Sequence, residues 1–143
     1  MEGGIDVIGS GLEADDIDAV LTFWRRAAGP STLVDEAVDI NRVVKTTTSS
    51  LLLAVDDDVL VGSIIAGWDG WRGNLYRLAV AQDRRAQGLG RRLVAAAEES
   101  LAERGCQRVT ALVHLELGDA APFWAKVGYE HDTEVGRFVR NLE

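Results

Sequence analysis

Two hydrophobic periods succeed one another along the chain. Apolar residues three and four positions apart predict helices, whereas short apolar runs bounded by glycine, asparagine or aspartate predict strands. The pattern predicts, in order, a strand at 5–8, helices at 12–27 and 34–46, strands at 51–55, 59–67 and 74–80, a helix from about 88 to 104, a strand at 109–113, a helix at 120–127, and strands at 129–132 and 135–142. This mixture of strands and helices predicts an α/β fold.

The run at 74–80 is expected to form the central strand of the sheet. Alternation would place its residues on two faces, one set being Tyr76, Leu78 and Val80 and the other Leu75, Arg77 and Ala79. An arginine in the middle of such a strand needs a partner. The strand at 109–113 is expected to run parallel to it through a right-handed crossover.

Three consecutive acids, Asp56 to Asp58, separate the strands at 51–55 and 59–67. Carboxylates between two apolar runs are typical of a hairpin turn, and we favour that interpretation over a metal site. Gly62 within the second strand indicates a bulge or a close approach of two backbones. The sequence predicts no metal site, because neither histidine lies at metal-ligand spacing from Cys106.

The length of 143 residues favours one domain spanning 1–143. No apolar run approaches the length of a membrane span, and the first residues lack the features of a signal peptide. A single cysteine is compatible with a reducing cytoplasm, where we expect the protein to act. The net charge of −8 disfavours broad nucleic-acid binding and permits a cationic partner.

Positive charge is concentrated around one glycine-rich stretch, Arg85-Ala86-Gln87-Gly88-Leu89-Gly90. It follows an apolar run and precedes a helical pattern, so unpaired N–H groups and the positive end of a helix dipole are expected there. Glycine lets an anion approach the backbone closely. The stretch therefore predicts an anion site flanked by Arg84, Arg85, Arg91 and Arg92; the alternative is a glycine-capped helix with a solvated basic face.

Two other kinds of site were weighed. Gly9-Ser10-Gly11 opens a loose dinucleotide-binding pattern with Asp35 at the spacing of a ribose-binding acid, but the acids that follow would repel a pyrophosphate. Cys106, His114 and Asp119 could be drawn as a thiol triad, although no local motif supports one and a lone cysteine is usually a small core residue.

The Arg85-x-x-Gly88-x-Gly90 stretch after Leu78-Ala79-Val80 resembles motif A of the GNAT N-acetyltransferases. Ala120-x-x-Phe123-Trp124-x-Lys126-x-Gly128-Tyr129 resembles that family's last helix and the strand after it. The segment from Gly67 to Gly73 is similar to a subgroup of small bacterial members whose acceptors are unassigned. The resemblance covers nearly the whole chain.

The resemblance implies a GNAT (acyl-CoA N-acyltransferase) fold, in which a mixed, mostly antiparallel sheet contains a splayed parallel pair and is flanked by helices. It implies that acetyl-CoA is the cosubstrate and that an N–H near Val80 bonds the thioester oxygen. The residues expected to bind coenzyme are Leu78, Ala79, Val80, Arg85, Ala86, Gln87, Gly88, Leu89, Gly90 and Arg91.

Side chains for proton transfer are less evident. The family often has a tyrosine acid where this chain has Trp124, and an indole N–H is not a usable acid. The family's usual glutamate base is not evident on the 74–80 strand. Asp69, His114 and Glu116 are the candidate bases, and Tyr129 is expected in the core rather than as an acid.

The acceptor is expected to contact Trp24, Asp69 and Trp71, with a core role for Trp24 and tip packing for Trp71 as the alternatives. The sequence thus predicts direct acetyl transfer from acetyl-CoA to an amine of a small molecule, peptide or protein N-terminus. An α-amine is favoured over lysine, because its pKa lies nearer neutrality. The alternative is a non-catalytic acyl-CoA sensor. A homodimer is expected from the resemblance alone.

Overall fold

The computed structural model describes residues 4–9, 12–27, 36–114 and 118–142. Those residues belong to two compact units, Met1–Leu112 and Val113–Glu143, and each unit is described by itself. The first unit holds the sheet and three of the helices, and the second holds the last helix.

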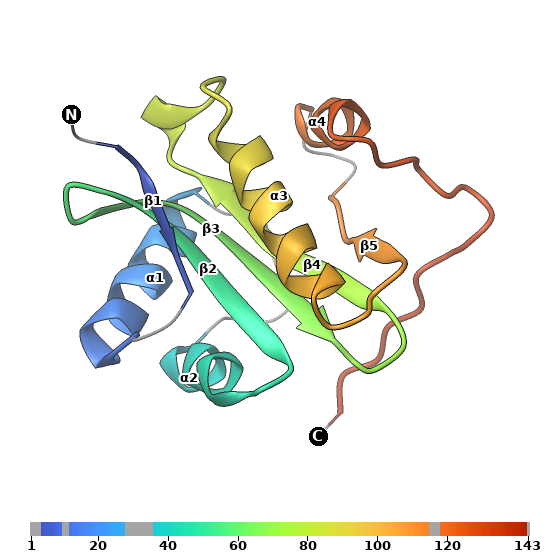
Figure 1. Cartoon of the computed structure of the whole chain (residues 1–143), viewed down its shortest axis with the longest axis horizontal. Helices are drawn as coiled ribbons and strands as arrows, with labels where there is room; N and C mark the ends of the chain where they lie inside the picture. Colours follow the sequence, from blue (N-terminus) through green and yellow to red (C-terminus); the bar gives the residue numbers. More distant parts are fainter. Residues whose placement is uncertain (1–3, 10–11, 28–35, 115–117, 143) are drawn as a thin grey trace. The chain divides into compact units, whose positions relative to one another are not determined.

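A five-stranded sheet with the order β1-β2-β3-β4-β5 forms the first unit (Figure 1). Its strands are β1 (Asp6–Ile8), β2 (Ser49–Asp56), β3 (Val59–Trp68), β4 (Gly73–Val80) and β5 (Val109–Ala111). The first three pairings are antiparallel, and only β4 and β5 run parallel. The expected mixed sheet with a parallel pair is confirmed. The central strand is β3, however, and not the 74–80 strand, because both β1 and β2 lie on the other side of β3.

Helices cover both faces of this sheet. Gly62 and Ser63 are neighbours on β3, so they face opposite sides. A Cβ on Gly62 would lie 2.9 Å from Leu93 Cδ1 of α3 (Leu89–Ala102), whereas Ser63 accepts a hydrogen bond from Trp24 of α1 (Ala14–Ala27). Therefore α3 covers one face and α1 the other. The helix α2 (Ala37–Lys45) packs against α1 and β2 on the face of α1.

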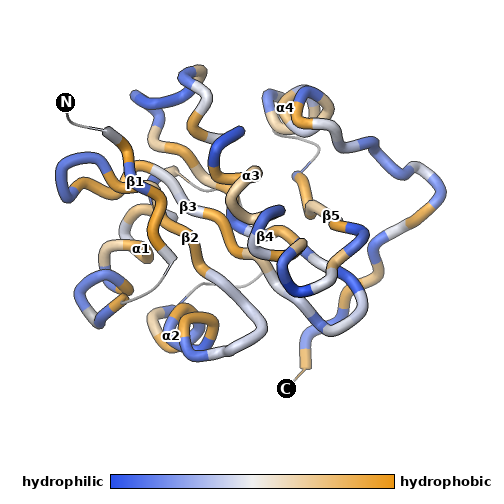
Figure 2. Tube along the Cα trace, viewed as in Figure 1, coloured by the Kyte–Doolittle hydropathy of each residue, from blue (hydrophilic) through white to orange (hydrophobic). Residues whose placement is uncertain are grey.

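A hydrophobic core lies between the helices α1 and α2 and the strands of the sheet. Figure 2 shows hydrophobic residues along the strands and hydrophilic ones at the turns. One buried cluster joins the two helices to the sheet, and its members are Ile17, Val20, Phe23, Trp24, Ile40, Leu51, Leu53 and Ala79. Burial of this apolar surface fixes α1 against the strands that precede the glycine-rich loop.

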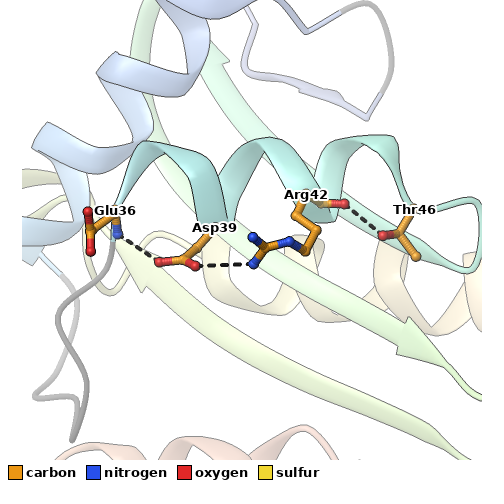
Figure 3. A network of polar contacts seen from close by, with 4 residues as sticks. All are labelled: Glu36, Asp39, Arg42 and Thr46. Carbon is orange, nitrogen blue, oxygen red and sulfur yellow. Dashed lines mark hydrogen bonds and ion pairs between the residues drawn. The ribbon is translucent and has the colours of Figure 1, made fainter. Parts of the chain in front are cut away.

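The second helix begins at Ala37, later than the predicted residue 34. Figure 3 shows the contacts that set its ends: the Glu36 N–H donates to Asp39 Oδ2 over 3.1 Å, and Arg42 Nη1 lies 3.4 Å from Asp39 Oδ1. At the other end, Thr46 Oγ1 donates to the carbonyl of Arg42. The carboxylate of Asp39 satisfies a free N–H at the N-terminus, as in a capping box.

The predicted hairpin between β2 and β3 is confirmed, but its loop has two residues, because Asp56 belongs to β2. Asp57 and Asp58 both have positive φ, at 49° and 65°, and Asp56 pairs with Val59. Two left-handed residues are what a tight hairpin of type I′ requires, and aspartate tolerates that conformation.

The strand β4 contains an extra residue, which the alternation pattern did not anticipate. Tyr76 pairs with Ile65 and Ala79 pairs with Ser63, so Arg77 and Leu78 together oppose one residue of β3. Arg77 has φ of 54°, as at the first position of a bulge. The predicted face assignment is therefore wrong beyond Tyr76: the bulge brings Ala79 to the α1 side, where it joins the buried cluster.

The second unit contains α4 (Ala120–Lys126). The helix predicted at 120–127 is therefore confirmed. Its N-cap residue is Asp119, whose side chain makes no capping bond, and Gly128 follows the helix with φ of 99°. The strands predicted at 129–132 and 135–142 are wrong, since the described residues of this unit contain no strand. An extended segment becomes a strand only when another chain segment pairs with it. Phe138 is instead 98% exposed.

Close packing at Gly62 gives a stability prediction. We expect Gly62→Ala to lower the free energy of unfolding by about 1–2 kcal/mol, because overpacking against Leu93, Ala54 and the Ala79 carbonyl outweighs the stabilisation that comes from the lower entropy of the unfolded chain. Urea denaturation measures this. Gly4→Ala is the control, since a Cβ there meets no atom within 4 Å. Equal stability of the two variants would contradict the packing.

Candidate active site

The glycine-rich stretch connects β4 to α3. A short 3₁₀ turn, Gln82–Arg84, follows the strand, and α3 begins at Leu89 with Gly88 as its N-cap. Gly88 has φ of 82°, in the left-handed region that glycine adopts without strain. Gly88 itself makes no side-chain capping bond, and the first N–H groups of a helix have no partner within the helix. The predicted start of this helix is confirmed.

Arg84 is paired within the protein. Its guanidinium bonds the carboxylate of Asp56 at the end of β2, and both side chains are largely buried. The hydrogen bond to Asp56 raises the pKa of Arg84 above its usual value. The pair ties the 3₁₀ turn to the β2–β3 hairpin. Arg84 therefore supplies less net charge to an anion than the sequence suggested.

Arg85 and Arg92 also bond the backbone of the first unit. Arg85 Nε donates to the Val80 carbonyl over 3.1 Å, and its Nη2 lies 3.4 Å from the Ala27 carbonyl at the end of α1. Arg92 Nη2 donates to the Ile5 carbonyl over 2.8 Å. Carbonyl acceptors do not cancel the positive charge, so these two cations hold the loop in place and still attract an anion.

The second part of the site is the edge of β4 that faces β5. The parallel pairing joins Gly73–Leu75 to Val109–Ala111 and ends with the Leu112 N–H near the Leu75 carbonyl. Beyond that point β4 continues to Val80 without further pairing to β5. The Ala81 N–H donates to Val61 on the β3 side, so alternation directs the Val80 N–H to the β5 side.

These two features fit a ligand with a diphosphate and an extended polar arm. Backbone N–H groups at the start of a helix bind phosphate oxygens, and an unpaired strand edge bonds amides and carbonyls. At Gly88 a Cβ would meet no atom within 4 Å, so the loop is open on that side. Both features lie on one stretch of chain: Leu78, Ala79 and Val80 end β4, and the residues from Arg85 to Arg91 form the loop and the start of α3.

Trp24 is buried rather than displayed on a surface. Its side chain is 6% exposed, and its Nε1–H donates to Ser63 Oγ over 2.8 Å. The Arg77 guanidinium lies over the indole, 5.2 Å from the ring centroid. These contacts favour a structural role for Trp24, the alternative noted from the sequence.

Asp69 and Trp71 lie at the opposite end of β4 from the loop. They belong to the four-residue turn between β3 and β4, and β4 spans roughly 20 Å at about 3.3 Å per residue. Asp69 Oδ1 accepts the N–H groups of Trp71 and Arg72, while Trp71 is 70% exposed beneath the Arg72 guanidinium. The structure does not bring either residue to the anion loop.

The remaining candidates belong to the second unit. His114 is exposed, and Glu116 lies outside the described residues. Trp124 is buried, with its ring 5.4 Å from Phe123 and 5.0 Å from Tyr129 in edge-to-face contacts. An indole in such a cluster has a packing role. Tyr129 is half-buried and packs edge-to-face on Trp124, and its core role stays a prediction.

Two residues that support the site, Ser63 and Asp56, were not predicted from the sequence. Ser63 is fully buried, and its hydroxyl bonds both Trp24 and the Arg77 carbonyl. The signal for it was the hydroxyl within the apolar run of β3. Asp56 was assigned to a solvated turn, and only the structure shows that its carboxylate meets Arg84.

Other kinds of site find no support in the part of the chain that the structure describes. No group of three acidic, histidine or cysteine residues gathers there as a metal site would require. No helix within the same residues is long and apolar enough to cross a membrane. The dinucleotide alternative fails because β1 pairs antiparallel with β2, whereas that fold needs a parallel pair; Ser10, Gly11 and Asp35 lie outside the described residues.

Comparison with known sequences gives a consistent result. The profile described as the acetyltransferase (GNAT) family matches residues 17–129. Acetyltransferase ECA0875 of Pectobacterium atrosepticum is 32% identical over 116 residues, which are 81% of this chain and 82% of that protein. Acetyltransferase plu1384 of Photorhabdus laumondii is 35% identical over 117 residues, 81% of each chain.

Solved structures share the fold at low identity. The aminoglycoside N-acetyltransferase AAC(6')-Iy, in complex with CoA, has a TM-score of 0.81 at 15% identity, covering 99% of this chain and 98% of that one. AAC(6')-Ih from Acinetobacter baumannii has a TM-score of 0.78 at 15% identity, covering 98% and 100%. At this identity the likeness concerns the fold alone.

The turn at Asp69 generates a test of its proposed role as a base. Hydrogen bonds from the Arg72 and Trp71 N–H groups lower the pKa of Asp69. Because the pKa of Asp69 is lower in the folded than in the unfolded chain, its ionised carboxylate stabilises the folded protein. This stabilisation is complete at neutral pH and is lost as the pH falls through the folded pKa. We expect a carboxyl ¹³C NMR titration to give a midpoint below that of Asp69 in the denatured chain. A midpoint at or above the denatured value would contradict the turn and favour a free base.

Proposed function

Because the chain belongs to the acetyltransferase (GNAT) family and is an acetyl-CoA-dependent N-acetyltransferase, we propose a location for its donor and a class of acceptor. The diphosphate of acetyl-CoA binds the N–H groups of Gly88 to Arg91, and its pantetheine arm follows the edge of β4 toward Val80. The non-catalytic sensor is not favoured, since the relatives reported above are named acetyltransferases.

The observation that carries this proposal is the glycine-capped start of α3 directly after the part of β4 that does not pair with β5. A helix of 14 residues presents its N–H groups beside a left-handed Gly88, and Arg85 joins the loop to the Val80 carbonyl. The anion-binding and arm-binding groups are thereby held in one rigid connection. Backbone donors serve both parts, so the site needs few special side chains.

The chemistry is a direct transfer. The neutral amine nitrogen attacks the thioester carbonyl carbon, a C–N bond forms, the C–S bond breaks, and the sulfur leaves as thiolate. The amine loses one proton, which passes to solvent or to a base. A main-chain N–H on β4 stabilises the oxygen that gains negative charge. A thiol pKa of about 8.5 makes thiolate a tolerable leaving group without an acid at Trp124.

We propose a small amino compound as the acceptor. The net charge of −8 favours a cationic one, and several fold neighbours are aminoglycoside acetyltransferases. An α-amine or aromatic amine is neutral more often at pH 7 than a lysine side chain, whose pKa is about 10.4. Asp69 is hydrogen-bonded in its turn, so this acceptor class, which needs little help from a base, suits the described residues.

The location and the assembly of the protein are also part of the proposal. We propose that the protein acts in the cytoplasm, where acetyl-CoA is available, and that it works without nucleic acid or a membrane. A homodimer remains a prediction from the family resemblance.

The experiment for the activity is a thiol-release assay with acetyl-CoA and a panel of amines. The panel should contain α-amines of amino acids and peptides, aromatic amines, aminoglycosides and lysine side chains. We expect release that depends on a small amino compound. Release with lysine side chains alone would contradict the acceptor class, and binding without release across the panel would support the sensor.

Gly88 offers the sharpest variant of the donor site. We expect Gly88→Asp to weaken CoA binding about tenfold or more in calorimetry, because a carboxylate would face the diphosphate. Gly88→Asn should change the affinity by less than about threefold, since asparagine tolerates a positive φ equally well and carries no charge.

Gly105→Asp is the positional control, since Gly105 has φ of 94°, open space and a place just beyond the far end of α3. It should leave CoA affinity unchanged. Equal losses for Gly88→Asn and Gly88→Asp would show that strain, and not charge, is responsible.

Trp124 gives a prediction about the leaving group. We expect Trp124→Phe to keep kcat within about threefold of the wild type, since an indole N–H cannot protonate a thiolate and phenylalanine preserves an aromatic contact with Tyr129. Steady-state thiol release measures it. A loss of a hundredfold in a folded variant would assign the indole a direct role.

A further inference from the structure

We propose that Ser63 is a positioning residue, and that with Trp24 it aims the Leu78 N–H at the thioester oxygen. This inference rests on the donor site proposed above and adds to it the group that orients the oxyanion donor. Its basis is one hydrogen-bonded chain: Trp24 Nε1 donates to Ser63 Oγ over 2.8 Å, and Ser63 Oγ donates to the Arg77 carbonyl over 2.9 Å.

The bulge in β4 creates the need for this contact. Arg77 and Leu78 oppose a single residue of β3, so the regular ladder between the strands is interrupted there. A carbonyl withdrawn from water without a partner is costly. The Ser63 hydroxyl supplies a partner from β3 to the part-buried Arg77 carbonyl, and Ser63 is the buried polar side chain among the described residues of the core.

The geometry of the peptide bond relates this contact to the direction of the Leu78 N–H. The Arg77 carbonyl and the Leu78 N–H belong to one planar trans peptide, so they point in opposite directions. Ser63 holds the carbonyl toward β3, on the side of the sheet that α1 covers. The Leu78 N–H is consequently turned to the opposite edge of β4, beyond the point where pairing with β5 ends at Leu75. The thioester arm is proposed to lie along that edge.

Trp24 keeps the hydroxyl in one orientation. A serine hydroxyl rotates freely, but accepting the indole N–H leaves its own hydrogen free for the carbonyl. The Arg77 guanidinium lies over the same indole, so Trp24 contacts the side chain of Arg77 directly and its carbonyl through Ser63. Trp24 thereby supports the site from within the core and needs no contact with the acceptor.

The first experiment follows the Leu78 amide in ¹H–¹⁵N NMR. In the wild type, acetyl-CoA should shift the Leu78 amide proton further downfield than CoA does, because only acetyl-CoA carries the carbonyl. In Ser63→Ala this difference should disappear while the loop amides from Gly88 to Gly90 respond as before. An unchanged Leu78 difference in Ser63→Ala overturns the proposal.

Kinetics provide a second measurement, with the amine that the wild type acetylates. Ser63→Ala should lower kcat about tenfold or more, since loss of an oxyanion donor costs about 10²–10³ and misalignment costs part of that. The KM for acetyl-CoA and the Kd for CoA should stay within about threefold. Ile40→Val, a core change of comparable cost in stability on α2, should leave kcat unaltered.

Trp24→Phe covers the case in which Ser63→Ala fails to fold. It removes the N–H and keeps the ring, so the Leu78 shift difference and kcat should fall in the same direction by a smaller factor. Wild-type kcat in Trp24→Phe, together with wild-type kcat in Ser63→Ala where that variant folds, overturns the proposal. Failure of the wild type to bind acetyl-CoA would instead overturn the donor site, so the two failures are distinguishable.

Discussion

The extra residue in β4 is the constraint from which the site's geometry follows. Because Arg77 and Leu78 share one partner position on β3, every residue after them points to the face opposite to that expected from a regular strand. Ala79 enters the core beneath α1, and the strand's final amides turn toward the edge that β5 leaves. Buried groups on β3 and α1 bond the backbone at the bulge.

The glycine-rich loop is then fixed by contacts with several separate elements. Arg84 reaches the end of β2, Arg85 reaches the ends of β4 and α1, and Arg92 reaches the residue before β1. Three of the four arginines that flank the loop thus also hold it against other elements of the first unit. Because the donors are already ordered before the anion binds, no binding free energy is lost in ordering them. The backbone N–H groups of α3 remain the natural ligands of the anion.

Most of the fold could be predicted from the sequence because it depends on local signals. The hydrophobic period, the glycines and the acidic turn residues located β2, β3, α1 and α3. The hairpin between β2 and β3 followed from turn chemistry. What could not be predicted depends on tertiary contacts. The bulge at Arg77 requires Ser63 of another strand, the start of α2 is set by Asp39, and the apolar pattern of 135–142 forms no strand in the described second unit. Likewise Asp56 looked solvated until Arg84 was placed beside it.

The central claim is that backbone amides at the start of α3 hold the diphosphate of acetyl-CoA. The most direct measurement is a ¹H–¹⁵N NMR titration of the full chain with CoA. The account predicts saturable shifts that are largest for the amides of Gly88, Leu89 and Gly90, with smaller ones along Leu78–Val80. Saturable binding that leaves those loop amides unmoved, or no binding by well-folded protein, would contradict it.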